Sequence, residues 1–147
     1  MKKQLLAHCT GIAKSKVEAL ENELNSTREA TTSESKSSAG DKHETGRAMM
    51  HLEQEKLHKQ LAEAQSVVAE LERIDPFVIH TQVCLGSLIN TNKGMFFLAA
   101  GLGKVEMEET SYFVVSTKAP IASQFLGKGV GDKANMNGTM YDILSID

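Results

Sequence analysis

The sequence predicts an α+β fold: an N-terminal antiparallel helical hairpin, or coiled coil, followed by a small antiparallel β-sheet domain with one short helix. First, every aromatic residue and both prolines lie between Pro76 and Tyr141. Second, the residues before Pro76 are rich in Ala, Leu, Glu, Lys and Gln, which are strong helix formers. Third, most glycines and the β-branched runs follow that point. We therefore predict a hairpin over residues 1–75 and a β-rich domain over residues 76–147.

The first helix shows the spacing of a helix that packs against another helix. Apolar or small residues recur at intervals of three and four, which is typical of a narrow helix–helix seam. The positions are Leu6, Cys9, Ala13, Lys16, Leu20 and Leu24, where Lys16 is the polar exception and Val17 lies beside it. Residues 26–40 are rich in Ser and Thr, which lowers helix propensity, and the sequence leaves helix or loop open there. If the helix continues, we expect it to reach about Ser35, with the break at Gly40.

The second helix continues the same rhythm. Its seam residues are Leu57, Leu61, Ala64, Val68 and Leu71. A helix with one apolar stripe needs a partner, and the nearest candidate is the other helix of the same chain, folded back as a hairpin. Arms of roughly 30 residues would extend about 45 Å, with the tip near residues 40–45.

Short apolar and β-branched runs predict the strands of the second domain. The runs are residues 83–89, 95–100 and 111–116, and the acidic stretch 101–110 is expected to be a loop. Asn137-Gly138 separates residues 133–136 from residues 139–146 and indicates a two-residue hairpin. Pro120 and Gly127 mark the start and end of one short helix.

Charge and cysteine usage exclude several classes of protein. The net charge of −3 argues against a broad basic surface for bare nucleic acid. Cys9 and Cys84 are isolated and form no disulfide framework, and we expect Cys9 to be inert in the seam. The apolar runs are too short for a signal peptide or a membrane span. We expect a cytoplasmic monomer without a membrane partner.

The most distinctive local feature is Gly40-Asp41-Lys42-His43-Glu44 at the predicted tip. Carboxylates three residues apart share one face of a helix, and the start of a helix favours negative charge. One interpretation is structural: Asp41 is the N-cap and Glu44 its capping-box partner. The other is functional: the two carboxylates hold a divalent cation, because Mg²⁺ prefers oxygen ligands and commonly takes one or two carboxylates from a protein. Both can hold at once.

The segment Ser38 to Glu44 resembles the acidic tip of the Gre-type (GreA/GreB-like) transcript cleavage and elongation factors, whose hairpin turn carries G-D-x-x-E. A second match lies in the β-rich half, where that family has a strand ending in Ser, a Pro-initiated helix, an L-[IL]-G-K-x-x-G-D turn and a Y-x-I strand. The matching residues are Ser116 to Ala122, Leu126-Gly127-Lys128, Gly131-Asp132 and Tyr141 to Leu144. The resemblance covers nearly the whole chain and implies an FKBP-like β domain.

The resemblance implies a partner and a role. Gre factors insert the hairpin into the secondary channel of bacterial RNA polymerase, and the β-rich domain would grip the channel rim. Asp41 would be the principal ligand of the second Mg²⁺, and Glu44 would support it or orient water. The polymerase would then cleave the backtracked RNA 3′ end by two-metal hydrolysis. On this basis the chain is not an enzyme by itself and needs no cofactor in isolation.

Two alternatives remain open. After the acidic pair the family usually continues Asn-Ala-Glu-Tyr, whereas this chain has Thr45-Gly46-Arg47-Ala48, so the first alternative is a polymerase regulator that does not cleave. The second is an interaction module, unrelated to transcription, that needs an exposed apolar stripe outside the seam. Other residues have plainer interpretations: Met49 and Met50 as hairpin packing, His51 and His58 as a solvated helix face, and Arg47 as a possible phosphate contact.

Overall fold

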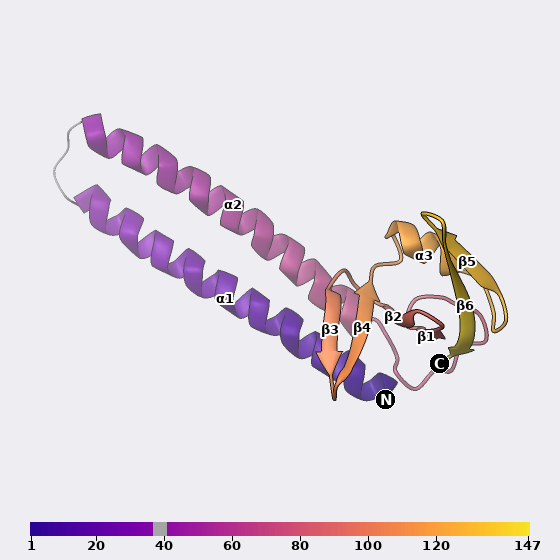
Figure 1. Ribbon diagram of the computed structural model, residues 1–147. Coiled ribbons are helices and arrows are strands. Elements are labelled where there is room, and N and C mark those ends of the chain that lie inside the picture. The colour runs from indigo at the N-terminus through magenta and orange to yellow at the C-terminus, as the bar shows by residue number, and fades with distance from the viewer. Residues whose placement is uncertain (37–40) are drawn as a thin grey trace. The chain divides into compact units, whose positions relative to one another are not determined.

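The structure confirms the predicted fold class. The computed structural model describes the backbone of residues 1–36 and 41–147 and the side chains of residues 1–29 and 45–147. The elements in chain order are α1 (Lys2–Lys36), α2 (Asp41–Glu72), β1 (Leu88–Thr91), β2 (Gly94–Leu98), β3 (Gly103–Met107), β4 (Thr110–Val115), α3 (Pro120–Phe125), β5 (Lys133–Met136) and β6 (Thr139–Ile146) (Figure 1). Two long helices thus precede a sheet with one short helix.

Packing divides the chain into two compact units. The hairpin unit is Ile12–Ser66, which contains most of α1 and α2. The sheet unit joins Met1–Gly11 to Val67–Asp147. The first turns of α1 and the last turns of α2 therefore belong with the sheet, and the boundary predicted at residue 75 falls inside the sheet unit.

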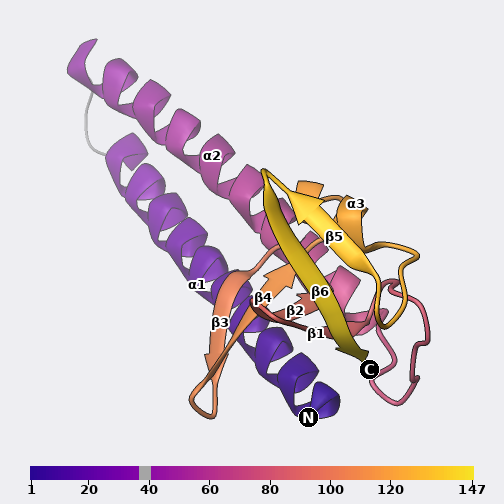
Figure 2. The ribbon, with the colours of Figure 1, turned by 45° about the vertical axis from the view of Figure 1, so that its right-hand side comes forward.

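In the hairpin unit, α1 and α2 run side by side (Figures 1 and 2). Their contact is the apolar seam that the spacing predicted: Leu20, Leu24, Leu57 and Ala64 are buried, with Val17 and Leu61 packed against them. Val17 occupies the position that the strict rhythm assigned to Lys16, and Lys16 is exposed. The α1 helix continues to Lys36, so residues 26–36 are helical and the expected end near Ser35 is confirmed.

The seam changes character beyond Leu24 and Leu57. The next half-buried residues along it are Thr27 on α1, and Gln54 and Met50 on α2. Thr27 and Gln54 therefore stand where leucines stand around Leu57, and Met50 is the apolar residue of this distal part of the described hairpin. Since apolar burial supplies most of the stability of a helix pair, this distal part gains less from packing than the region around Leu57.

The sheet has six strands in the order β3-β4-β2-β1-β6-β5. Four neighbouring pairs are antiparallel, and the β2–β4 pair is parallel. The expectation of a purely antiparallel sheet is therefore wrong at one place. The chain leaves β2, skips one position to form β3 at the edge, and returns as β4 in the gap. This return makes β4 run in the same direction as β2.

Both faces of the central strands are covered. Phe96, Phe97 and Leu98 of β2 are consecutive and all buried, which is typical of a strand packed on two sides. One face holds a core with α3, formed by Val83, Ile89, Phe96, Leu98, Ala122, Phe125, Ala134 and Ile143. On the other face, Leu88 pairs with Phe97 and Phe97 with Val114, and all three are buried. In both views the first turns of α1 lie beside β3 and β4 (Figures 1 and 2).

Two strand predictions need correction. The run predicted over residues 83–89 forms a strand only from Leu88, and that strand continues to Thr91. The predicted loop 101–110 contains β3, which has one buried residue, Val105. An edge strand with so little burial shows no apolar alternation, so the sequence pattern missed it. The Asn137-Gly138 hairpin is confirmed, with positive φ at both residues.

A buried lysine ties the start of α1 to the segment after α2. Lys2 is 2% exposed, and its Nζ donates a hydrogen bond to the carbonyl of Val78 at 2.6 Å. Burial lowers the pKa of Lys2, and the nearby negative charge of Asp147 partly opposes that shift. Lys3 Nζ lies 5.3 Å from the ring centroid of Phe77. Among the described residues, no helix has the length and apolarity needed to cross a membrane.

Candidate functional site on the helical hairpin

The predicted tip residues fall in the first turn of α2. The helix begins at Asp41, and Glu44 is its fourth residue. Their side chains lie outside the described residues, so both the capping-box and the metal-ligand interpretations stay predictions. The backbone places the pair in the first turn of α2, at the N-terminal end of the helix, where the helix dipole favours carboxylates.

The three residues after Glu44 are exposed or half-buried. Thr45 and Arg47 are exposed and Gly46 is half-buried. Arg47 therefore follows the acidic pair by one turn, with its guanidinium accessible to an anion. Its planar fork of donors suits a phosphate or carboxylate better than a lysine would.

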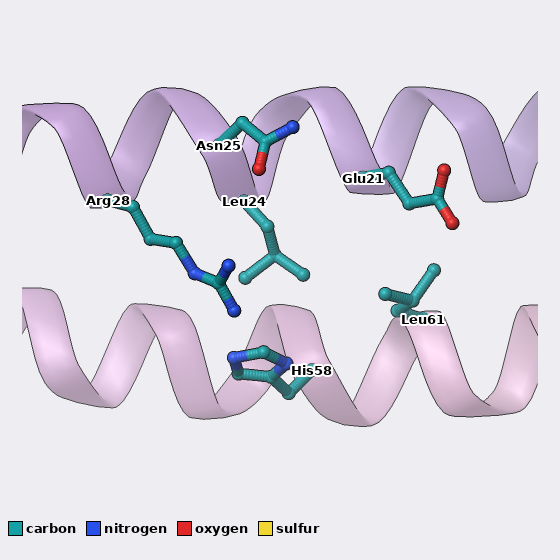
Figure 3. Close-up of a pocket in the computed structure, with 6 residues that line it drawn as sticks. All are labelled: Glu21, Leu24, Asn25, Arg28, His58 and Leu61. Atoms are coloured by element: carbon teal, nitrogen blue, oxygen red, sulfur yellow. The ribbon is translucent and has the colours of Figure 1, made fainter.

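One side of the seam bears a polar groove of about 250 Å³. Its lining residues are Glu21, Leu24, Asn25 and Arg28 from α1, and His58 and Leu61 from α2 (Figure 3). The Arg28 side chain extends toward α2, where the His58 ring faces it (Figure 3). The sequence placed His58 on a solvated face, and the structure shows it exposed but also bordering this groove.

The chemistry of the polar groove is mixed. Arg28 and Asn25 supply hydrogen-bond donors, whereas Glu21 supplies an acceptor and a negative charge. Leu24 and Leu61 add apolar surface between them. The side chains described by the structure contain no cluster of three His, Cys, Asp or Glu residues that could hold a metal ion. A groove with both charge signs does not select one class of small ligand.

The other side of the seam bears a more apolar groove of about 480 Å³, which we call the methionine groove. It is lined by Glu23, Ser26 and Thr27 from α1, and by Met49, Met50 and Glu53 from α2. Met50 is half-buried, as expected of hairpin packing. Met49 is 67% exposed, so the interpretation of Met49 as packing is wrong. It lies about 100° around the helix from Met50 and so points off the seam.

Sequence reasoning missed the methionine groove, although one signal was present. Met49 and Leu52 are apolar and three residues apart, so they share a helix face. That face is offset from the seam through Leu57, Leu61 and Ala64. A second apolar row on an otherwise polar helix indicates a surface, and Leu52 is indeed 65% exposed.

The second motif of the sequence serves mainly to build turns. Ser116 Oγ accepts a hydrogen bond from the Lys118 N–H at 3.1 Å, two residues before the Pro120 that starts α3. In the following turn, Asp132 Oδ2 accepts from the Gly129 N–H at 2.8 Å. Tyr141 then packs edge-on against Phe96 and Phe125. The FKBP-like character of this domain stays a prediction.

No family model and no curated protein matches the chain. Solved structures do match. The crystal structure of GreA factor homolog 1 (Gfh1) protein of Thermus thermophilus is 12% identical, with 94% of each chain covered and a TM-score of 0.35. A structure of the transcription factor Gfh1 is 16% identical over 90% of this chain and 94% of that chain, with a TM-score of 0.36. Identities and TM-scores this low assign no function, so the function is argued from the residues themselves.

Proposed function

We propose that this chain is a Gre-type transcription factor that binds bacterial RNA polymerase through the secondary channel and assists cleavage of backtracked RNA. The supporting observation is that α2, of 32 residues, begins at Asp41, so Asp41 and Glu44 lie in its first turn, shortly after α1, of 35 residues, ends at Lys36. The turn and strand motifs of the sheet domain follow in the order that the family has.

The donor set of the tip fits Mg²⁺. Asp41 and Glu44 offer hard carboxylate oxygens, and Mg²⁺ in enzyme sites typically takes one or two such groups from a protein. In the proposed role Asp41 is the principal ligand, and Glu44 supports it or orients the attacking water. A bound Mg²⁺ supplies a polarised phosphate and a more acidic water. The polymerase contributes the rest of the active site, so the chain acts as a cofactor of that enzyme and not as an enzyme itself.

Transcript cleavage in stalled, backtracked elongation complexes with Mg²⁺ tests this proposal. Wild-type protein should shorten the RNA from its 3′ end. Asp41→Asn should lower the cleavage rate by at least about 10-fold, because it removes a metal ligand and keeps the size of the side chain. Glu44→Gln should lower it less. Glu29→Gln, an exposed carboxylate on α1 outside the tip, is the matched control and should leave the rate unchanged.

Polymerase binding is measured on the same proteins by co-migration in gel filtration. Binding without cleavage would replace the cleavage role with that of a non-cleaving regulator, in keeping with Thr45-Gly46-Arg47 after the acidic pair. No binding would overturn the polymerase proposal. The second candidate, a protein-interaction module, is favoured by the exposed Met49 and Leu52, which form an apolar row outside the seam.

A further inference from the structure

The hairpin unit carries apolar surface that its own fold does not use. Met49 is 67% exposed and Leu52 is 65% exposed, one turn apart on α2. Met49 also lines the methionine groove, together with the half-buried Met50. The row and the groove therefore form one surface from the seam to the outer face of α2. Adjacent exposed apolar side chains of this size mark interaction sites more often than isolated ones do.

The charged residues of this groove have one sign. Glu23 of α1 and Glu53 of α2 both line it, one on each wall. Among the described residues, no lysine or arginine lines it. Lys56 follows Leu52 by one turn but lies outside the lining, and Arg28 borders the polar groove on the opposite side of the seam. An apolar floor between two carboxylates complements an apolar side chain flanked by cations.

We propose that the methionine groove docks a basic amphipathic helix of a protein partner. Apolar side chains of that helix, three or four residues apart, would cover Met49 and Leu52, and its lysines or arginines would reach Glu23 and Glu53. Methionine suits this role, because its flexible, polarizable side chain adapts to differently shaped partners. The inference goes beyond the polymerase proposal, since it uses neither Asp41 nor Glu44.

A second copy of this chain fits the groove less well. A two-fold contact sets the same patch of both copies face to face. It would bring the Glu23 and Glu53 carboxylates of both copies into one interface, and among the described residues the groove lining supplies no cation to offset them, which opposes association. The same two carboxylates disfavour nucleic acid, because they face the phosphates of its backbone. A cationic protein segment meets neither obstacle.

Methyl NMR of the full chain provides the test, with methionine methyl groups labelled with ¹³C. The probe is a synthetic helical peptide of leucine and lysine in which leucines repeat every three or four residues. A second peptide replaces every lysine with glutamate. We expect the Leu/Lys peptide to shift the Met49 and Met50 methyl signals to saturation. Met140, which is 45% exposed in β6, should stay in place, and the Leu/Glu peptide should shift neither groove signal.

Variants separate the apolar and the charged contributions. Leu52→Gln should weaken binding of the Leu/Lys peptide roughly 10-fold, as loss of a central apolar anchor does. Glu23→Gln with Glu53→Gln should weaken it several-fold at low salt and make it insensitive to added salt. Met140→Gln is the matched control and should bind like wild type. These side chains are exposed or border an open groove, and far-UV circular dichroism verifies that each variant remains helical.

Several results would overturn the inference. One is a Met140 shift as large as that of Met49, which would show unspecific adhesion. Another is equal binding of the Leu/Glu peptide, which would remove the role of Glu23 and Glu53. A third is a Met49 signal that moves with protein concentration alone, together with a dimer in analytical ultracentrifugation. This result would show that a second copy of the chain occupies the groove. The transcript-cleavage assay stays independent, because these variants leave the tip unchanged.

Discussion

The two cysteines have opposite surroundings. Cys9 is fully buried, and burial raises the pKa of its thiol to about 11. Cys84 is exposed, with its N–H donating to Ser87 Oγ at 3.0 Å. Because the thiolate is the reactive form, Cys9 is protected both by exclusion of reagent and by its pKa.

We expect Ellman's reagent at pH 8 to modify one thiol rapidly in the folded protein and the second only after unfolding. Cys84→Ser should remove the rapid phase, and Cys9→Ser should leave it. Two equally rapid thiols would contradict the structure. The raised pKa also couples to stability. The contribution of the neutral Cys9 thiol is fully present below its ordinary value of 9.0 and is lost as pH rises through about 11.

The inert state of Cys9 was predictable, and the exposure of Cys84 was not. Cys9 falls on the three-and-four spacing with Leu6 and Ala13, and all three are buried as that spacing predicts. Cys84 stands in a stretch that the sequence assigned to a strand. It lies outside any strand because β1 begins only at Leu88. Backbone pairing with β2 and with β6 decides that boundary, and β6 is distant in the sequence.

At the scale of single elements, two glycines occupy similar space but different backbone conformations. Gly11 lies inside α1, and Gly103 begins β3 with a φ of +75°. A Cβ built on either would meet nothing within 4 Å. Steric room is therefore equal, and conformation alone should decide the effect of a side chain.

Gly11→Ala should stabilise the protein by about 0.5–1 kcal/mol, since alanine loses less entropy than glycine on entering a helix. Gly103→Ala should destabilise it by about 1 kcal/mol, because a positive φ strains an L-residue. Urea denaturation of both variants measures the two changes in the free energy of unfolding. Changes of the same sign would contradict this account.

The residues in the turns explain why the sequence predicted the β5–β6 hairpin and not the β3–β4 hairpin. Asn137-Gly138 has the residues that a tight turn with positive φ requires, and it connects β5 and β6 as predicted. Glu108-Glu109 makes the corresponding turn between β3 and β4, with φ of 49° and 62°. Glutamate is not a residue that indicates such a turn, so the sequence pattern did not predict β3 and assigned its residues to a loop. The pairing of β3 with β4, which reaches Met107 and Thr110, flanks that turn directly.

At the scale of the whole molecule, the two units can be followed by different spectroscopic signals. Both tyrosines, Tyr112 and Tyr141, belong to the sheet unit, and the chain has no tryptophan. Tyrosine fluorescence therefore follows the sheet unit, whereas the circular dichroism signal at 222 nm is dominated by α1 and α2. Two probes can thus separate the unfolding of the two units.

Leu57→Ala should lower the stability of the hairpin unit by about 2–5 kcal/mol, because Leu57 is 2% exposed in the seam. Its effect on the helical signal should exceed its effect on tyrosine fluorescence. Leu52→Ala, on the same helix and 65% exposed, is the matched control and should change either transition by less than about 0.5 kcal/mol. Identical shifts in both probes would show that the units unfold together.

The candidate sites were predictable to different degrees. The start of α2 at Asp41 agrees with the local Asp41–Glu44 signal, whereas the role of the two carboxylates stays a prediction. The methionine groove had only a partial signal in the Met49–Leu52 spacing, because its two walls depend on how the seam orients α2 against α1. A one-residue difference decides that Met50 is half-buried and Met49 exposed. Only the packed pair reveals such a difference.

The pairing of β1 with β6 also sets an order of assembly during synthesis. Leu88 exchanges backbone hydrogen bonds with Asp147, at 3.0 and 2.8 Å. On the ribosome, the hairpin unit is a continuous stretch that can fold once residue 66 has left the exit tunnel. The sheet unit can be completed only when β6 has emerged, and until then Met1–Gly11, which is made earlier, lacks part of its unit. Met1–Gly11 therefore gains its full set of contacts in the sheet unit only after β6 has been made.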